Sequence, residues 1–119
     1  MKRPARAALR VEREVLPRGT PARSLSAHAL ESAVDLLSAM AHPARLRVLL
    51  ALSRRGPQSA GALAELCGLE QSAASHQLRV LRDARLVAAE RDGKRIIYRL
   101  ADDHVAQIVE DALAHAAEG

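Results

Sequence analysis

The chain has 119 residues, which is enough for one domain with a modest core. Hydrophobic residues make up 49% of it, but Tyr98 is the only aromatic, so we expect small aliphatic side chains to share apolar surface with a second subunit. No apolar run approaches the roughly 20 residues that span a bilayer, and the Arg-rich start lacks the apolar segment of a secretory signal. The single cysteine, Cys67, excludes an internal disulfide. These features exclude a membrane protein and predict a cytoplasmic one.

The net charge of +4 is concentrated in the first 23 residues. They carry seven basic and two acidic residues, a sum of +5, so the rest of the chain sums to −1. Because prolines and a glycine interrupt this segment, we expect residues 1–26 to be a disordered basic tail and residues 27–119 to be one domain. Such a tail adds sequence-independent attraction to DNA phosphates. A merely solubilising extension is the alternative.

The first two predicted helices are amphipathic. Residues 28–40 have apolar side chains at helical spacing. Those expected to face inward are Leu30, Val34, Leu37 and Met40. Pro43 opens a second helix over residues 44–54, and the Gly-Pro pair at 56–57 ends it. Its expected core face consists of Leu46, Leu49, Leu50 and Leu52. His42 lies in the turn between the two helices, where we expect a structural role.

Residues 60–84 have the pattern of a helix-turn-helix. Ser59 is a suitable N-cap for a helix over residues 60–67, with Leu63 and Leu66 on its apolar side, and Gly68 stops it. The second helix, residues 71–84, is expected to bury Ala74, Leu78 and Leu81. Its other side is polar, has no acidic residue before Asp83, and is typical of a helix in the major groove of DNA. The expected DNA contacts are Gln71, Ser72, Ser75, His76, Gln77 and Arg79.

After Leu86 the period of the apolar residues changes from 3.6 to 2. Residues 86–91 and 94–100 flank Asp92-Gly93, a strong β-hairpin signal. A hairpin in this position predicts a wing, which must pack on the helices because an isolated hairpin is marginal. Its tip suits the minor groove or the phosphate backbone, with Arg91, Lys94 and Arg95 as the expected contacts. The predicted fold class is mainly α with a small β-hairpin, a winged helix-turn-helix.

The last predicted helix, residues 105–115, is amphipathic and is flanked by four potential metal ligands. Its apolar stripe consists of Val105, Ile108, Val109, Ala112 and Leu113. The ligand candidates are Asp102, His104, His115 and Glu118. The two histidines are 11 positions apart, roughly 16 Å along a helix, which is too far for one metal. The pairs meet only if two copies of the helix run antiparallel, which predicts a dimer with two symmetric intersubunit sites.

These residues also have a structural interpretation. Asp102 and Asp103 are suitable helix-starting residues, and His115 near the other end complements the helix dipole. Asp102 and His104 are two positions apart and do not face each other in a regular helix, so we expect that pair at a frayed helix start. Fraying is also expected at Glu118, where water could replace the fourth ligand.

With these motifs, residues 33–118 resemble the ArsR/SmtB family of bacterial metal-responsive winged-helix repressors. The resemblance is carried by AHPARLRVLLAL (41–52), LAELCGLEQSAASHQLRVLRDARLV (63–87), RDGKRIIYRL (91–100) and DDHVAQIVEDALAH (102–115). The SAASHQLRVLR stretch is its most specific part. The family's dimers form through the first and last helices, which implies a homodimer here. Glu70 departs from the pattern, because family members commonly have Ser at that N-cap.

The resemblance also bears on the metal. One family site uses cysteines on the first helix of the helix-turn-helix, and the corresponding segment here has Ser59 and no cysteine, which implies that this site is absent. A second site type has the pattern D-x-H…H-x-x-E that the four C-terminal residues carry. Two histidines and two carboxylates form a closed set that zinc accepts. The family's nickel sensors recruit further histidines from the termini, and the first ten residues here have none. We therefore expect Zn(II), with Ni(II) and Co(II) as alternatives.

The expected function is that of a repressor whose metal-free dimer binds double-stranded operator DNA and is released by zinc, with reciprocal coupling. The resemblance implies His115 as the link, its second ring nitrogen reaching the backbone near His76. A metal-independent regulator and a zinc hydrolase are the alternatives, and the absence of an obvious substrate cleft disfavours the hydrolase.

Three other side chains have simpler interpretations. Cys67 fills a position that favours a small apolar residue, and without a resolving cysteine a redox switch is disfavoured. Arg45 and Arg47 either contact phosphate or pair with acidic neighbours.

Overall fold

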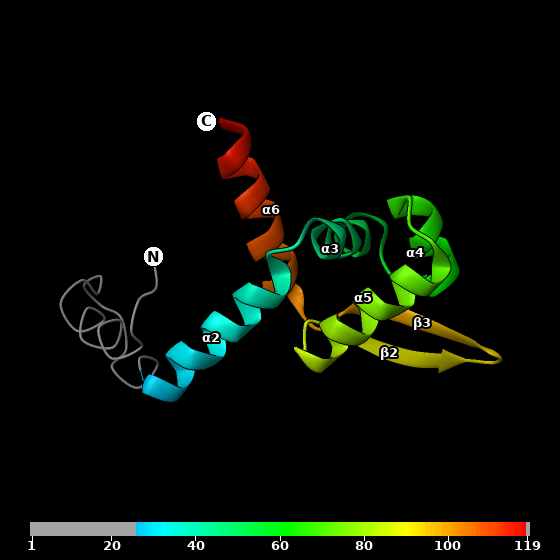
Figure 1. The fold of residues 1–119 in the computed structure, drawn as a ribbon, viewed down its shortest axis with the longest axis horizontal. Helices are drawn as coiled ribbons and strands as arrows, with labels where there is room; N and C mark the ends of the chain where they lie inside the picture. The colour runs from blue at the N-terminus through cyan, green and yellow to red at the C-terminus, as the bar shows by residue number, and fades with distance from the viewer. Residues whose placement is uncertain (1–25, 119) are drawn as a thin grey trace. The chain divides into compact units, whose positions relative to one another are not determined.

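The computed structural model describes residues 26–118. Its elements are α2 (Ala27–Met40), α3 (Pro43–Arg55), β1 (Gln58–Ser59), α4 (Ala60–Cys67), α5 (Gln71–Asp83), β2 (Val87–Asp92), β3 (Arg95–Leu100) and α6 (Asp103–Glu118) (Figure 1). The predicted basic tail lies outside the described residues except for Ser26, whose hydroxyl accepts a hydrogen bond from the Ala29 N–H. One unit of the chain ends at Asp35, and a second, compact unit begins at Leu36 and holds the core. Within residues 26–118 no helix is long and apolar enough to cross a membrane.

The core forms where α3, α4, α5, α6 and the sheet meet, and most of its side chains are Leu and Val. Its fully buried large side chains are Val48, Leu49, Leu63, Leu78, Leu81, Leu86 and Val109. The predicted buried positions of α5 are confirmed, including Ala74. On α3, Leu49 and Leu52 are buried as predicted and Leu46 and Leu50 pack at the edge, but the prediction omitted Val48, which is completely buried.

Some apolar residues that were expected to face inward are exposed in the single chain. Val34 and Leu37 of α2 are 54% and 51% exposed, and Leu66 of α4 is 41% exposed. Met40 of α2 is buried as predicted, but the other residues of this helix that pack on the core are Leu36 and Ala39 and not Val34 and Leu37, because the buried side of the helix is rotated from the expected one. On α6, likewise, Val105 and Val109 are buried while Ile108 and Ala112 are exposed.

The wing belongs to a three-stranded antiparallel sheet of order β1-β3-β2. The sequence predicted only the hairpin of β2 and β3, because β1 is two residues long and is defined by its pairing, Gln58 with Tyr98 and Ser59 with Ile97. The predicted turn was wrong by one position. Asp92 pairs with Arg95, so the loop is Gly93-Lys94. The φ angle of Gly93 is 67°, and the φ angle of Lys94 is not positive. A glycine with positive φ at the first loop position is typical of a type II′ hairpin turn.

The helix-turn-helix is defined by its caps. Ser59 Oγ accepts from the Ala62 N–H at 3.2 Å, and Gly68 takes the left-handed conformation that ends α4, as predicted. Glu70 makes no side-chain cap bond, in agreement with its departure from the family pattern. At the far end of α5, the N–H of Leu86 donates to the Leu81 carbonyl around Arg85, whose φ is 62°. This Schellman-type end turns the chain sharply from α5 into β2.

Ser53 and Arg54 of α3 hold Glu110 of α6, and we call these three residues the α3–α6 clamp. Ser53 Oγ donates to Glu110 Oε2 at 3.0 Å, and Arg54 donates from Nε to Oε2 at 3.2 Å and from Nη2 to Oε1 at 3.1 Å. The Arg54 hydrogen bond, followed by that of Ser53, lowers the pKa of Glu110, and Glu110 raises the pKa of Arg54. This bidentate contact joins the last turn of α3 to the middle of α6.

His42 caps α3, in agreement with its predicted structural role. Its ring Nδ1 accepts from the Ala44 N–H at 3.2 Å. His42→Ala is expected to cost about 1 kcal/mol of unfolding free energy, the usual value for a lost N-cap, whereas His42→Asn should retain most of the stability because Asn also accepts at this position. Urea unfolding of the two variants measures the difference, and equal stability of His42→Ala and the wild type would contradict this role.

The clamp predicts a pH dependence. Since the pKa of Glu110 is lowered by folding, its carboxylate stabilises the fold above the unfolded-state pKa of about 4.3, and this contribution is lost as the pH falls through the lower folded-state pKa. Glu110→Gln should therefore lose less stability than the wild type between about pH 7 and about pH 3. Urea midpoints with a metal chelator present measure this. The matched control is Glu90→Gln, because Glu90 pairs with Arg99 at 3.6 Å on the exposed wing. Equal acid sensitivity of both variants would refute the clamp's contribution.

Candidate functional site

The polar side of α5 is exposed over its first three turns. Five of the six predicted DNA contacts on this helix have exposed side chains, namely Gln71, Ser72, Ser75, His76 and Arg79. The apolar side of the same helix is in the core, so the division of α5 into two sides that the sequence predicted is confirmed. A helix held on one side and polar on the other has the form that enters a major groove.

Gln77, the sixth predicted contact, differs from the others because it is half-buried and already has a partner. Arg45 Nη1 of α3 donates to Gln77 Oε1 at 3.1 Å. The same guanidinium donates from Nε to the Ala39 carbonyl at the end of α2. Arg45 therefore forms no pair with an acidic residue among the described residues, contrary to one of the two interpretations of it. Sequence reasoning missed this contact because residues 45 and 77 are 32 positions apart.

The wing presents cations at its tip. Arg91, Lys94 and Arg95 are all exposed, and the Arg91 guanidinium donates to the Gly93 carbonyl at 3.4 Å within the turn. Ile96 beside them is 41% exposed. Strand β2 packs against α5, and Figure 1 shows the tip of the hairpin projecting beyond the helices. The wing can therefore reach backbone next to any groove that α5 enters.

One of the two predicted ligand pairs lies at the start of α6. His104 Nδ1 is 3.5 Å from Asp102 Oδ1, and the side chains are 92% and 57% exposed. Asp102 also caps the helix, because its Oδ1 accepts from the Val105 N–H at 3.2 Å. The structural interpretation of Asp102 is thus confirmed, yet the cap leaves its other oxygen free. Since α6 begins at Asp103, Asp102 precedes the helix and His104 lies in its first turn.

The other pair lies at the opposite end of α6. His115 and Glu118 are three positions apart on the continuous helix, and both are exposed. Among residues 26–118 no three potential ligands come together within one chain, so this chain alone does not assemble the four-residue set. The His115 ring has no hydrogen bond to the backbone near His76 within the described part of the chain. That link stays a prediction.

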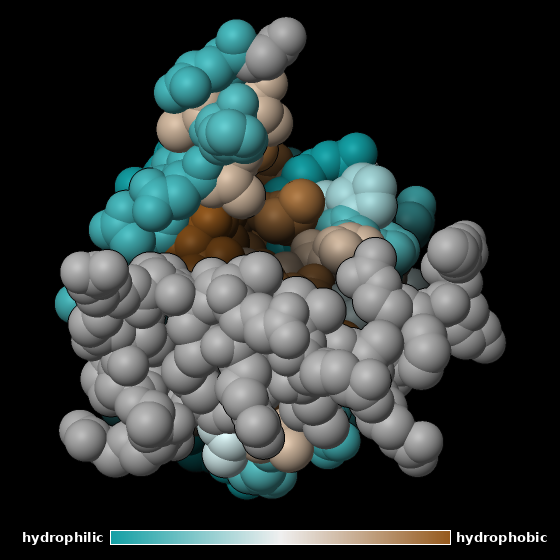
Figure 2. Space-filling view, turned by 90° about the vertical axis from the view of Figure 1, so that its left-hand side faces the viewer, coloured by the Kyte–Doolittle hydropathy of each residue, from teal (hydrophilic) through white to brown (hydrophobic). Residues whose placement is uncertain are grey.

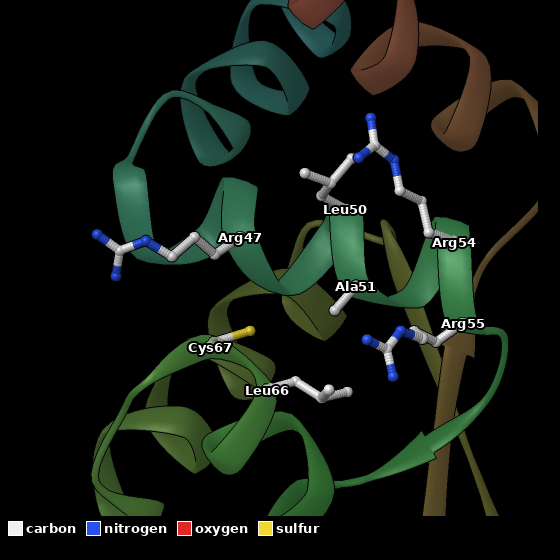
Figure 3. Close-up of a pocket in the computed structure, with 7 residues that line it drawn as sticks. All are labelled: Arg47, Leu50, Ala51, Arg54, Arg55, Leu66 and Cys67. Carbon is white, nitrogen blue, oxygen red and sulfur yellow. The ribbon is translucent and has the colours of Figure 1, made fainter.

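Cys67 lies at the floor of a hollow of about 240 Å³ between α3 and α4. In Figure 3 its sulfur points into the hollow and Arg55 leans across it, while Arg47 points away from it. Burial raises the pKa of the Cys67 thiol, and the charge of Arg47 opposes this only in part. A neutral thiol is a poor nucleophile, which agrees with the apolar role predicted for Cys67.

Apolar surface remains uncovered on α2 and α6. Val34 and Leu37 on α2 and Ile108 on α6 are the most exposed apolar side chains of these helices. In Figure 2 hydrophobic surface is visible beside the base of the helix that runs to the C-terminus, whose own surface is partly hydrophilic and partly weakly hydrophobic. These three large aliphatic side chains are left uncovered by the described part of the chain.

Comparison with known proteins agrees with this geometry. A family model described as a helix-turn-helix domain matches residues 40–89. The HTH-type transcriptional regulator NmtR of Mycobacterium tuberculosis is 46% identical over 99 residues, which cover 83% of this chain and 82% of NmtR. The HTH-type transcriptional repressor SmtB of the same species is 40% identical over 89 residues, covering 75% of this chain and 65% of SmtB.

Solved structures extend the agreement to the fold. The homodimeric winged helix-turn-helix DNA-binding domain of a possible ArsR-family regulator from Mycobacterium bovis is 30% identical, with a TM-score of 0.72 over 86% of this chain and 92% of that domain. These relatives are transcriptional regulators, so the protein is a DNA-binding regulator and not an enzyme, and the zinc hydrolase alternative is wrong. The chain belongs to the ArsR/SmtB family of metal-responsive winged-helix transcriptional repressors.

Proposed function

We propose that this protein is a zinc-responsive repressor that binds operator DNA as a metal-free dimer in the bacterial cytoplasm. The observation that carries the proposal is the pairing of Asp102 with His104 at one end of α6 while His115 and Glu118 lie exposed at the other. Each pair supplies half of a ligand set. Two half-sets at opposite ends of one helix are complementary to a second, antiparallel copy of that helix.

The dimer is supported by the uncovered apolar residues. Val34 and Leu37 of α2 and Ile108 of α6 are large aliphatic side chains that the single chain leaves exposed, as subunit interfaces do. A symmetric contact between the first and last described helices of two copies would bury them. The basic tail, residues 1–26, is proposed to add non-specific attraction to DNA.

DNA binding is assigned to α5 and the wing. The exposed polar residues of α5 face base edges, and the cations of the β2–β3 tip contact the adjacent backbone or minor groove. Two copies of α5 in a symmetric dimer would read the two halves of an imperfect inverted repeat.

The donor set fits a closed zinc site. Asp102, His104, His115 and Glu118 offer two imidazoles and two carboxylates, all on exposed side chains. Zn(II), when bound, would supply a positive centre with a tetrahedral preference that these four groups match. Ni(II) prefers more ligands than this set provides, and Co(II) is the expected surrogate. A change in dimer geometry that misplaces the two α5 helices would then release the operator.

The test is fluorescence anisotropy with duplex DNA selected by the wild type from a random library, titrated separately with Zn(II) and Ni(II). Zn(II) should weaken DNA binding by roughly tenfold or more, within the usual range of allosteric coupling. His104→Ala and His115→Ala should bind DNA as tightly as the metal-free wild type and lose this response. His28→Ala, which removes an exposed histidine of α2, is the matched control and should retain it.

The outcomes separate the alternatives. Release of the DNA by Ni(II) and not by Zn(II) would agree with the proposed ligand residues but would contradict the assignment of zinc as the metal. Tight DNA binding that neither metal changes would overturn metal sensing and favour a metal-independent regulator. Full zinc response in both His115→Ala and His115→Gln would refute the assignment of His115 as the link to α5.

A further inference from the structure

One face of the β2–β3 hairpin begins in the core and ends in solvent. At its base Val87 is paired with Leu100, and both side chains pack in or against the core. Because side chains alternate along a strand, the same face of β3 continues through Tyr98 to Ile96. Ile96 lies opposite Arg91 in the register and is 41% exposed. The core-facing side of the hairpin therefore ends in an exposed pair of one apolar and one cationic residue.

Packing within the described part of the chain does not account for Ile96. Tyr98 and Leu100 on the same face pack against the core, whereas Ile96 is not among the residues that do. Ile97 on the other face is half-buried and is paired with Ser59 of β1. A strand needs no apolar residue at an exposed position, because Thr is also a good β-former.

The surroundings of Ile96 are cationic. Among residues 26–118, Arg91, Lys94 and Arg95 form no ion pair, while the nearby carboxylate of Glu90 is already paired with Arg99 at 3.6 Å. An apolar side chain beside free cations matches the edge of a DNA groove, where phosphates lie next to the C–H groups of deoxyribose. Apolar residues of minor-groove proteins make such contacts.

We propose that Ile96 is a DNA contact of the wing, which packs against deoxyribose at the edge of the minor groove while the neighbouring cations hold phosphates. The inference rests on the proposed binding of α5 in the major groove, which brings the wing to the adjacent backbone. An apolar contact releases no counterions, so the affinity that Ile96 contributes is independent of salt, unlike that of the cations.

The experiment compares Ile96→Thr with Ile96→Val in the metal-free protein. Both replacements are β-branched and similar in shape, so they differ in a hydroxyl in place of a methyl group. Binding of a duplex selected by the wild type is measured by fluorescence anisotropy at several salt concentrations. Ile96→Val should bind within about twofold of the wild type, and Ile96→Thr about fivefold more weakly or worse.

The salt dependence separates this contact from a charged one. Ile96→Thr should keep the wild-type slope of log affinity against log salt. Arg91→Gln should make the slope shallower by about 1.8, because the two wings of a dimer each lose one phosphate contact. A slope change in Ile96→Thr as large as that of Arg91→Gln would overturn the apolar contact.

The matched control is Ile97→Thr, the same change one position along β3 and on the other face of the hairpin. Because Ile97 is half-buried, this variant should lose at least as much stability in urea unfolding, yet it should keep the wild-type DNA affinity. Equal DNA affinities of Ile96→Thr and Ile96→Val, or an equal loss in Ile97→Thr, would overturn the proposal. A weaker dimer in Ile96→Thr, measured by analytical ultracentrifugation, would also overturn it, because Ile96 would then be a protein contact.

The test does not depend on the folding of one variant. Circular dichroism establishes whether Ile96→Thr is folded, and if it is not, Ile96→Ala replaces it with the same expected loss relative to Ile96→Val. Failure of the wild type to bind any duplex is a different result, because it would refute DNA binding and with it the proposed function.

Discussion

The buried side of α3 is the constraint on which the rest of the compact unit depends. This one helix packs against α4, α5, α6 and β3, with Val48 and Leu49 completely buried at its centre. A core without Phe or Trp gains little per residue, so each of these aliphatic contacts must be close and continuous. The polar residues of α3 are confined to its ends. His42 caps the start of α3 itself, while Arg45 near that start and the α3–α6 clamp at the finish contact the neighbouring helices.

This arrangement places α3 between the two proposed interfaces. The ligand candidates are on α6, which packs mainly on α3 and β3, and the DNA contacts are on α5, which packs on α3, α4 and β2. The α3–α6 clamp joins α6 to α3, and Arg45 joins α3 to Gln77 of α5, so polar contacts link both helices to α3. Packed helices of this kind change between discrete arrangements and do not deform continuously, which is the property that a two-state switch needs. These contacts connect α6 to α5 through α3, and the free energy that couples metal binding to DNA binding would be measured separately.

The features that could be predicted from the sequence are those that local chemistry determines. Ser59, Gly68 and the sharp division of α5 into two sides depend on neighbours within one turn, and the structure has them where they were expected. Features that depend on distant residues were missed. Strand β1 exists through its pairing with β3, and the contact of Arg45 with Gln77 joins two helices. The inward side of α2 was misjudged in part, because apolar spacing alone does not show which apolar residues of a helix pack on the chain's own core, as the exposed Val34 shows.

The exposed apolar residues of α2 and α6 and the separated ligand pairs of α6 have one feature in common, because both are incomplete in a single chain. A helix whose two ligand pairs are about 16 Å apart cannot complete a site alone, and a helix with an uncovered apolar side cannot complete its packing alone. If one antiparallel partner satisfies both, metal affinity includes the free energy of the dimer contact, and any ligand that favours one dimer geometry shifts the affinity for the other ligand. In the proposed dimer, operator DNA would fix the separation of the two α5 helices, whereas the ligand pairs would fix the relation of the two α6 helices. The two ligands would then oppose each other without sharing a residue, because both act on the geometry of one interface.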